Sequence, residues 1–229
     1  MHPGHSCGPG RARILKGMTT AKRALIVIDV QQEYFHGPLE IQYPPRQESL
    51  TRILEVIATA QAHGLPIAYA KHTTPAGSPV FAEGSEGWQL HPRIAEVVGD
   101  AKVFTKQFGS VYAGTDVATW LRDQEVDTVT LTGFMTHNCD LASSVESEGL
   151  GFTAEVLSDA SGATHLVNDT GHVPAQELHT TLMTLLNANF AAVATVGQWT
   201  SAVASQTPLA KDNLVASALA GRQKFGSAA

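Results

Sequence analysis

The chain has 229 residues, of which 43% are hydrophobic and 16% are charged, a balance typical of a globular protein and not of a disordered one. This length allows one α/β domain with a sizeable core. The net charge of −6 and the lack of any Lys/Arg-rich block argue against nucleic acid or a membrane surface as the partner. No apolar stretch approaches the ~20 residues that a membrane-spanning helix needs.

The N-terminal segment and the cysteines indicate the compartment. Residues 1–17 are rich in Gly, Pro, His and Arg and lack the apolar centre of a secretory signal. We therefore expect a flexible N-terminal extension ahead of a single domain at residues 18–229. The two cysteines, Cys7 in this extension and Cys139, cannot make a disulfide framework, which favours a reducing, cytoplasmic setting.

In the first half of the chain, apolar runs alternate with helical periodicity. Residues 24–30 form a continuous apolar run that ends near an acid, which predicts a central parallel strand buried on both faces. Apolar residues at helical spacing predict a helix at 47–62, and a second strand is expected at 65–70. Residues 73–92, rich in Gly, Pro and Ser, are predicted to be a long loop before a short strand at 101–105.

The second half continues the same alternation. Its predicted elements are a helix at 114–124, a strand at 127–132, a helix at 138–148, a strand at 152–157, a helix starting at Pro174 and a strand at 190–196. This β-α-β order predicts a mostly parallel sheet with helices on both faces. Residues 208–222 can form one more amphipathic helix, which we expect at a subunit contact because the sandwich does not require it.

Three reactive side chains follow three of the predicted strands. Asp29 closes the first strand, Lys106 follows the third, and Cys139 follows the fourth at the mouth of a helix. In open parallel sheets, catalytic groups gather beyond the carboxyl ends of the strands. The sequence therefore predicts that an acid, an amine and a thiol meet in one crevice.

The chemistry of these groups suggests a cysteine hydrolase. The helix N-terminus and Lys106 are expected to lower the pKa of Cys139 and so favour the thiolate, and Asp29 can take the thiol proton. The thiolate would attack an amide carbonyl, with the oxyanion on backbone N–H groups of the turn 135–139. Asp29 would then protonate the leaving amine, and water would hydrolyse the thioester.

Simpler interpretations of the same residues remain open. A cysteine at a strand–helix turn is often just a small buried hydrophobic side chain. A thiol redox or peroxide-sensing protein is a second possibility, but Cys7 in a tail is a poor resolving cysteine. A catalytically idle binding module is a third. His137 lies two residues before Cys139 and raises a Cys–His interpretation, although neighbours two apart in a tight turn usually point to different sides.

Three motifs resemble the isochorismatase-like cysteine hydrolase superfamily. The segment Asp29-Val-Gln31-Gln-Glu-Tyr34 is similar to its Asp-x-Gln-x-x-Phe signature. Lys106, followed by Ser110, Tyr112 and Thr115, resembles its Lys-x-x-x-Ser-x-Phe-x-x-Thr segment. Residues 133–139 resemble its Gly-x-x-Thr-x-x-Cys nucleophile turn.

The resemblance implies a fold and a site. The fold would be a three-layer αβα sandwich around a six-stranded mostly parallel sheet, and the catalytic triad would be Asp29, Lys106 and Cys139. A cis peptide at Phe134–Met135 would aim the Met135 N–H at the oxyanion, beside that of Cys139. The family commonly forms dimers and larger assemblies, so a homo-oligomer is expected.

The resemblance also separates branches of the family. True isochorismatases lack the cysteine, which is present here as Cys139. Nicotinamidases carry an Asp-x-His pair for a metal, whereas residues 70–74 hold no acid, and His72, His91 and His165 have no paired ligand spacing. We therefore expect neither a metal nor another cofactor.

The expected activity is metal-independent hydrolysis of a small-molecule amide or carbamoyl C–N bond. The residues predicted to line its pocket are Phe35, His72, Trp88, Phe108, Tyr112 and Met135. Core packing is an equally good interpretation for each aromatic residue alone. Asp140 follows the nucleophile directly, and we expect its carboxylate to face away, because a nearby negative charge would disfavour the thiolate.

Overall fold

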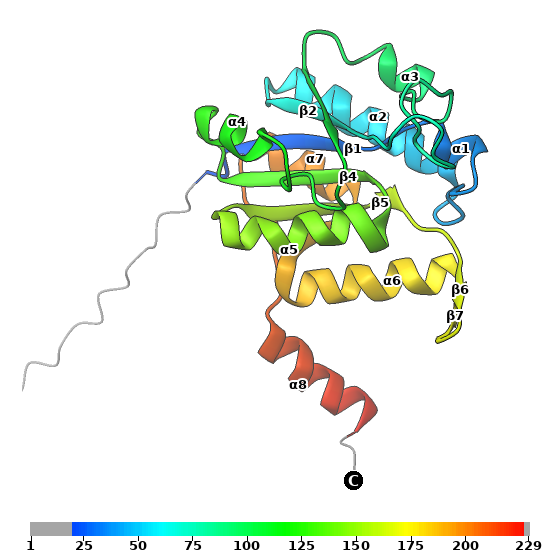
Figure 1. The fold of residues 1–229 in the computed structure, drawn as a ribbon. Coiled ribbons are helices and arrows are strands. Elements are labelled where there is room, and N and C mark those ends of the chain that lie inside the picture. Colours follow the sequence, from blue (N-terminus) through cyan, green and yellow to red (C-terminus); the bar gives the residue numbers. More distant parts are fainter. Residues whose placement is uncertain (1–19, 227–229) are drawn as a thin grey trace, which may run out of the picture.

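Six parallel strands form the centre of the molecule (Figure 1). The computed structural model describes residues 20–226, so the predicted extension at 1–17 and Cys7 lie outside the described residues. The strand order across the sheet is β3 (Lys102–Lys106), β2 (Ile67–His72), β1 (Arg23–Ile28), β4 (Thr128–Phe134), β5 (Thr153–Gly162) and β8 (Ala191–Ala194). All five strand pairs are parallel, which confirms the predicted sheet.

Strand β1 shows why the sheet lies between two layers of helices. All six of its residues are buried. Since successive side chains of a strand point to opposite faces, both faces of the sheet must be covered here. Leu25 and Val27 join one hydrophobic cluster, whereas Ile26 and Ile28 join a second one on the other face. A continuous apolar run is therefore what this position in the sheet demands.

Helices cover both faces and complete the three-layer αβα sandwich. Helices α2 (Arg46–Ala62) and α7 (Val196–Ala204) contribute Ile53 and Trp199 to the first cluster. The second cluster includes Leu121 of α4 (Val117–Asp123) and Met183 of α6 (Ala175–Leu185). Figure 1 shows α6 and α5 (Leu141–Leu150) on the side of the sheet opposite α2. Within residues 20–226, no helix is long and apolar enough to span a bilayer.

Several elements differ from the predicted ones. Strand β5 runs to Gly162, five residues beyond the predicted end at 157, because its last residues still pair with β4. The last strand, predicted at 190–196, ends at Ala194, and residues 196–204 form α7, a helix that was not predicted. The elements that the sequence analysis missed are the short helices α1 (Glu33–His36) and α3 (Pro92–Ala95), the hairpin β6 (Leu166–Asn168) and β7 (Gly171–Val173), and the π-helical turns η1 (Thr136–Asp140) and η2 (Leu186–Phe190).

The C-terminal helix α8 (Leu214–Phe225) corresponds to the helix predicted at 208–222, although it begins later. None of its residues is buried, and it extends away from the sandwich (Figure 1). Its apolar residues Leu214, Val215 and Leu219 are exposed.

The candidate site lies at the edge of the sheet formed by the carboxyl ends of its strands, next to β1 and β4. They are neighbours in the sheet, but β1 leads on to β2 on one side and β4 to β5 on the other. Such a switch in strand order leaves a crevice at the carboxyl ends of the strands. Gly133 makes the close approach of β4 to β1 possible: a Cβ there would lie 2.1 Å from the Ile28 carbonyl oxygen, and its φ is 122°.

Candidate active site

The three predicted reactive residues meet at this edge of the sheet. Asp29 directly follows β1, Lys106 is the last residue of β3, and Cys139 lies in the η1 turn after β4. Lys106 Nζ lies 2.7 Å from Asp29 Oδ2 and donates a hydrogen bond of 3.2 Å to Cys139 Sγ. All three are buried, and each is at most 2% exposed. The ammonium group is therefore the link between the acid and the thiol.

Two further neighbours fix the position of the Lys106 ammonium group. Its Nζ donates to the Phe108 carbonyl oxygen at 3.1 Å and lies 3.3 Å from His72 Nδ1. Because an ammonium group can only donate, Nδ1 of His72 must be an acceptor. Burial lowers the pKa of His72, and the charge of Lys106 lowers it further, which agrees with a neutral imidazole.

The charge of Lys106 is stable despite its burial. Burial lowers the pKa of Lys106, but the charge of Asp29 and the hydrogen bonds to Asp29 and Cys139 outweigh this effect and raise it overall. The lysine therefore stays an ammonium ion that can stabilise negative charge on either neighbour.

The expected lowering of the Cys139 pKa is wrong. Burial raises the pKa of the Cys139 thiol, the negative charge of Asp29 raises it further, and Lys106 opposes both. The local sequence around Cys139 does not reveal that its side chain is only 2% exposed. This shift favours the neutral thiol over the thiolate.

The glutamine of the first motif has a structural role that the sequence analysis did not assign. Gln31 Nε2 donates to the carbonyl oxygens of His72 at 3.0 Å and Trp88 at 2.8 Å. Its Oε1 accepts from the His72 N–H at 2.8 Å. Gln31 therefore ties the end of β2 to the loop after it and holds His72 beside Lys106. Its fixed place two residues after Asp29 was the available signal.

The nucleophile turn follows β4 directly. The peptide bond between Phe134 and Met135 is cis, and η1 begins at Thr136. The Met135 carbonyl oxygen accepts from the N–H groups of Asn138 and Asp140, which closes the turn around Cys139. Met135 is buried and precedes Cys139 by four residues in the chain.

Four of the predicted pocket residues lie around this edge. His72 contacts Lys106, and Met135 precedes the nucleophile turn. Trp88 donates from its indole N–H to Thr73 Oγ1 at 2.9 Å, and its ring lies 3.2 Å below the ammonium group of Lys71. Phe108 holds Lys106 through its carbonyl oxygen while its side chain is 59% exposed.

The structure places Phe35 and Tyr112 in the core instead. Phe35 is fully buried and packs edge-on against Phe134. The Tyr112 ring stacks on Phe152, and its hydroxyl group lies 2.9 Å from Ser147 Oγ on α5. Both rings fill space between layers of the sandwich, so their aromatic character reflects packing.

The two charged or titratable neighbours of Cys139 in the chain have different surroundings. His137 is partly buried, its Nδ1 has no hydrogen-bond partner among the described residues, and burial lowers its pKa. The basic side chain that donates a hydrogen bond to Cys139 Sγ is Lys106 and not His137.

Asp140 is fully buried, and this burial raises the pKa of its carboxyl group to about 7, so it is largely protonated in mildly acidic solution.

The described residues do not form a metal centre. Within 20–226, no three His, Cys, Asp or Glu side chains gather closely enough to hold a metal ion. His72 faces the Lys106 ammonium group, whose charge would repel a cation. Cys139 is a free thiol and the one cysteine in this range.

Comparisons with known proteins found a matching family model and similar structures. The model of the isochorismatase domain matches residues 23–198. A crystal structure from Burkholderia xenovorans LB400, provisionally assigned as an isochorismatase, is 42% identical with a TM-score of 0.88, and the match covers 91% of this chain and 100% of that one.

Two curated relatives are more distant. The uncharacterised isochorismatase family protein YrdC of Bacillus subtilis is 28% identical over 180 residues, which are 77% of this chain and 94% of YrdC. The maleamate amidohydrolase of Pseudomonas putida KT2440 is 28% identical over 158 residues, which are 63% of this chain and 74% of that enzyme.

Proposed function

The chain belongs to the isochorismatase family, and from that premise we propose that it hydrolyses the C–N bond of a small-molecule amide or carbamoyl compound through a thioester on Cys139. This family includes hydrolases of amides, among them the maleamate amidohydrolase that is similar to this chain. The observation that carries the proposal is the position of the Lys106 ammonium group between Asp29 and Cys139 Sγ.

The proposed first half-reaction makes the thioester, with Asp29 as base and then acid and Cys139 as nucleophile. The Asp29 carboxylate takes the proton from the Cys139 thiol, and the sulfur attacks the carbonyl carbon of the substrate. The oxyanion of the tetrahedral intermediate is held by the backbone N–H groups of Met135 and Cys139. Asp29 then gives its proton to the leaving nitrogen, which departs as ammonia or an amine and leaves a thioester on Cys139.

The second half-reaction restores the enzyme. Asp29 takes a proton from a water molecule, whose oxygen attacks the thioester carbonyl carbon. Collapse of the second tetrahedral intermediate breaks the C–S bond, releases the carboxylic acid and returns the proton to sulfur. Lys106 stays an ammonium ion throughout and stabilises whichever neighbour carries the negative charge.

The burial of the site favours a small substrate. Cys139 Sγ has Lys106 beside it and hydrocarbon neighbours from the second hydrophobic cluster, so little room is left around the reacting atom. Substrate entry therefore requires a movement of nearby segments, and the exposed ring of Phe108 lies on one of them. Water exclusion in such a closed site strengthens the electrostatic effect of Lys106.

The decisive experiment is a screen of small primary amides and ureido compounds, read by ammonia release. Cys139→Ala should abolish turnover of any compound that the wild type hydrolyses, while circular dichroism shows an intact fold. Dialysis against a chelator should leave the wild-type rate unchanged, because the mechanism uses no metal. Unchanged turnover in the Cys139 variant would remove the proposal, and a chelator-sensitive rate restored by zinc or iron would replace it with a metal mechanism.

A further inference from the structure

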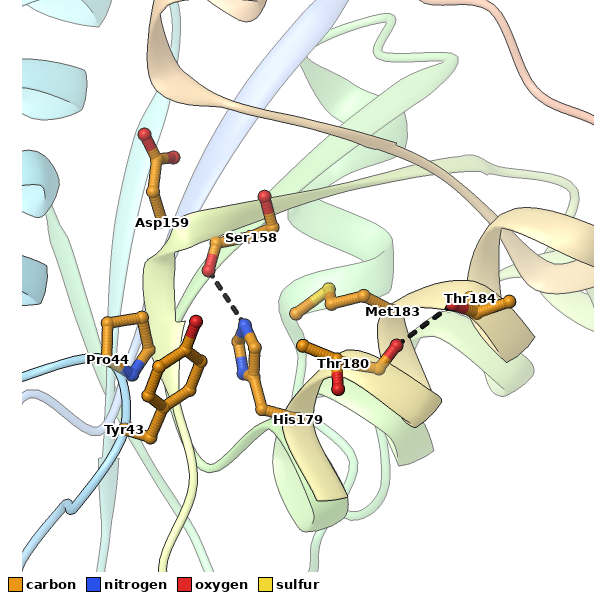
Figure 2. Close-up of a pocket in the computed structure, with 8 residues that line it drawn as sticks. All are labelled: Tyr43, Pro44, Ser158, Asp159, His179, Thr180, Met183 and Thr184. Carbon is orange, nitrogen blue, oxygen red and sulfur yellow. Dashed lines mark hydrogen bonds between the residues drawn. The ribbon is translucent and has the colours of Figure 1, made fainter. Parts of the chain in front are cut away.

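A buried histidine on α6 contacts the nucleophile turn from behind. His179 is 3% exposed, and its Nδ1 lies 2.9 Å from Thr136 Oγ1, while its Nε2 lies 3.0 Å from the Ser158 carbonyl oxygen of β5. Figure 2 shows the ring of His179 between Tyr43 and Met183, with one nitrogen pointing at Ser158. The histidine thus bridges a strand of the sheet and the turn that carries Cys139.

The chemistry of the two partners fixes the direction of both hydrogen bonds. A carbonyl oxygen can only accept, so Nε2 of His179 carries the proton and donates it to Ser158. Nδ1 is then a lone-pair acceptor, and the Thr136 hydroxyl group donates to it. Burial lowers the pKa of His179 while the bond to Ser158 opposes this, which agrees with a neutral ring.

Thr136 is well placed to pass this restraint on to the nucleophile. It is fully buried, it begins the η1 turn, and it precedes Cys139 by three residues in the same turn. Without the bond to His179, Thr136 would no longer anchor the start of the η1 turn. Cys139, later in the same turn, places its sulfur against Lys106. A displacement of about 1 Å at a reacting atom is enough to cost much of the rate.

We propose that His179 is a positioning residue that holds the nucleophile turn through the Thr136 hydroxyl group and so keeps Cys139 enclosed against Lys106. The inference rests on the proposed function, because it assigns His179 a task in the reaction of that same site. The hydrogen bonds of His179 go to Thr136 and Ser158 and not to Cys139 or Lys106, so its effect on the sulfur passes through Thr136.

The test uses alkylation of Cys139 by iodoacetamide, which does not depend on knowing the substrate. In the wild type the sulfur is enclosed and its pKa is raised by burial, so alkylation near neutral pH is slow. Thr136→Val and His179→Ala should each accelerate alkylation by about fivefold or more, because the loosened turn admits water and reagent. The double variant should be no faster than the faster single variant, since both changes break one link.

Matched controls separate this link from a general loss of stability. Thr184→Ala alters the same helix and the same pocket at an exposed side chain whose hydroxyl group bonds only within the helix, and it should stay within about twofold of the wild type. Thr136→Ser keeps the donor and should fall closer to the wild type than Thr136→Val. Once a substrate is known, Thr136→Val should lower kcat and leave KM nearly unchanged.

The pocket in Figure 2 allows a chemical rescue. His179 lines this pocket of about 390 Å³, so added imidazole can reach the space that His179→Ala leaves. Imidazole should slow alkylation of His179→Ala back toward the wild-type rate but not that of Thr136→Val. 1-Methylimidazole should have no effect, because it lacks the N–H that Ser158 requires.

Two results would overturn the inference. One is wild-type alkylation rates in both Thr136→Val and His179→Ala; the other is a double variant whose acceleration equals the product of the two single effects. If His179→Ala does not fold, Thr136→Val against Thr136→Ser decides alone. If the wild type hydrolyses no amide but the alkylation rates follow the expected order, the proposed function fails while the role of His179 in holding the turn stands.

Discussion

At the residue scale, the opposite effects of Asp29 and Lys106 on the Cys139 thiol are the most informative feature. Asp29 raises the pKa of Cys139, whereas Lys106 lowers it. The two charges are 2.7 Å apart and partly cancel at the sulfur. Removing one of them therefore reveals the effect of the other.

Asp29→Asn should accelerate alkylation of Cys139 while it abolishes amide turnover. Without the carboxylate, only burial still opposes the Lys106 ammonium group, so the thiol pKa falls, and each unit of the fall is worth about tenfold in thiolate at neutral pH. Lys106→Ala should have the opposite effect on alkylation and should also stop turnover. Iodoacetamide kinetics at pH 7 on the three proteins measure this, and equal rates would contradict the arrangement of charges.

Asp140 makes the stability of the protein depend on pH. Burial raises the pKa of its carboxyl group from 3.8 to about 7. At a pH between these two values, the folded protein keeps this proton, whereas the unfolded chain has released it. The stability from this protonation is fully present below about pH 4 and is lost as the pH rises through about 7. Asp140→Asn should therefore unfold at higher urea than the wild type at pH 8, with a smaller difference at pH 5. A constant difference between the two midpoints across this range would show that Asp140 does not titrate as described.

The sequence predicted the reactive residues better than their surroundings. Asp29, Lys106 and Cys139 could be found because each follows a recognisable apolar strand, and parallel strands bring their carboxyl ends together. The thiol pKa could not be predicted, since it depends on burial by residues far apart in the chain. Phe35 and Tyr112 were misassigned because an aromatic side chain fits a pocket wall and a core equally well.

At the element scale, a buried ion pair connects strands β1 and β5 to helix α7. Arg23 binds Glu155 through Nε and Nη2 at 2.8–3.1 Å, and both side chains are 2% exposed. The Thr130 hydroxyl and the Trp199 indole N–H also donate to Glu155, at 2.8 and 3.2 Å. This network lies at the start of β1, at the end of the sheet opposite Asp29.

Arg23→Leu should destabilise the protein by about 3–5 kcal/mol, because it leaves the Glu155 carboxylate buried without its counter-ion. Arg23→Leu combined with Glu155→Leu should recover much of this loss, since neither charge is then left alone. Urea unfolding of the three proteins measures the effect. A single variant as stable as the wild type would mean that the pair contributes nothing to the fold.

The long strands and helices were predictable because their periodicity extends over many residues. Strand β1 and helix α2 begin and end within one or two residues of their predicted positions. The extension of β5 and the separate helix α7 were missed, because the polar residues Ser158, Asp159 and Ser161 and the short connection before α7 hid the boundaries. The π-helical turn η1 has no sequence pattern of its own apart from the nucleophile motif.

At the scale of the whole molecule, helix α8 carries the prediction of a homo-oligomer. Its exposed residues Leu214, Val215 and Leu219 lie on a helix that stands away from the sandwich. Burial of a few such side chains on another copy would offset part of the cost of association. We propose that α8 contacts a second copy of this chain.

Light scattering after size-exclusion chromatography tests this contact. The wild type should elute as a dimer or a larger assembly, and the variant Leu214→Asp with Leu219→Asp should shift to the monomer mass. Gln223→Asp, on the same helix, adds one negative charge without removing an apolar side chain and should keep the wild-type mass. A monomeric wild type, or a mass that the double variant leaves unchanged, would place α8 outside any interface.

The covalent bond between Cys139 and the acyl group tests the central claim most directly. A compound that passes the ammonia screen is mixed with the enzyme, quenched in acid within one turnover, digested, and its peptides are weighed by mass spectrometry. The account predicts that the peptide containing Cys139 gains the mass of the acyl group, and that Asp29→Asn shows no such gain. Full turnover with no acyl adduct on Cys139, or with the adduct on another residue, would contradict it.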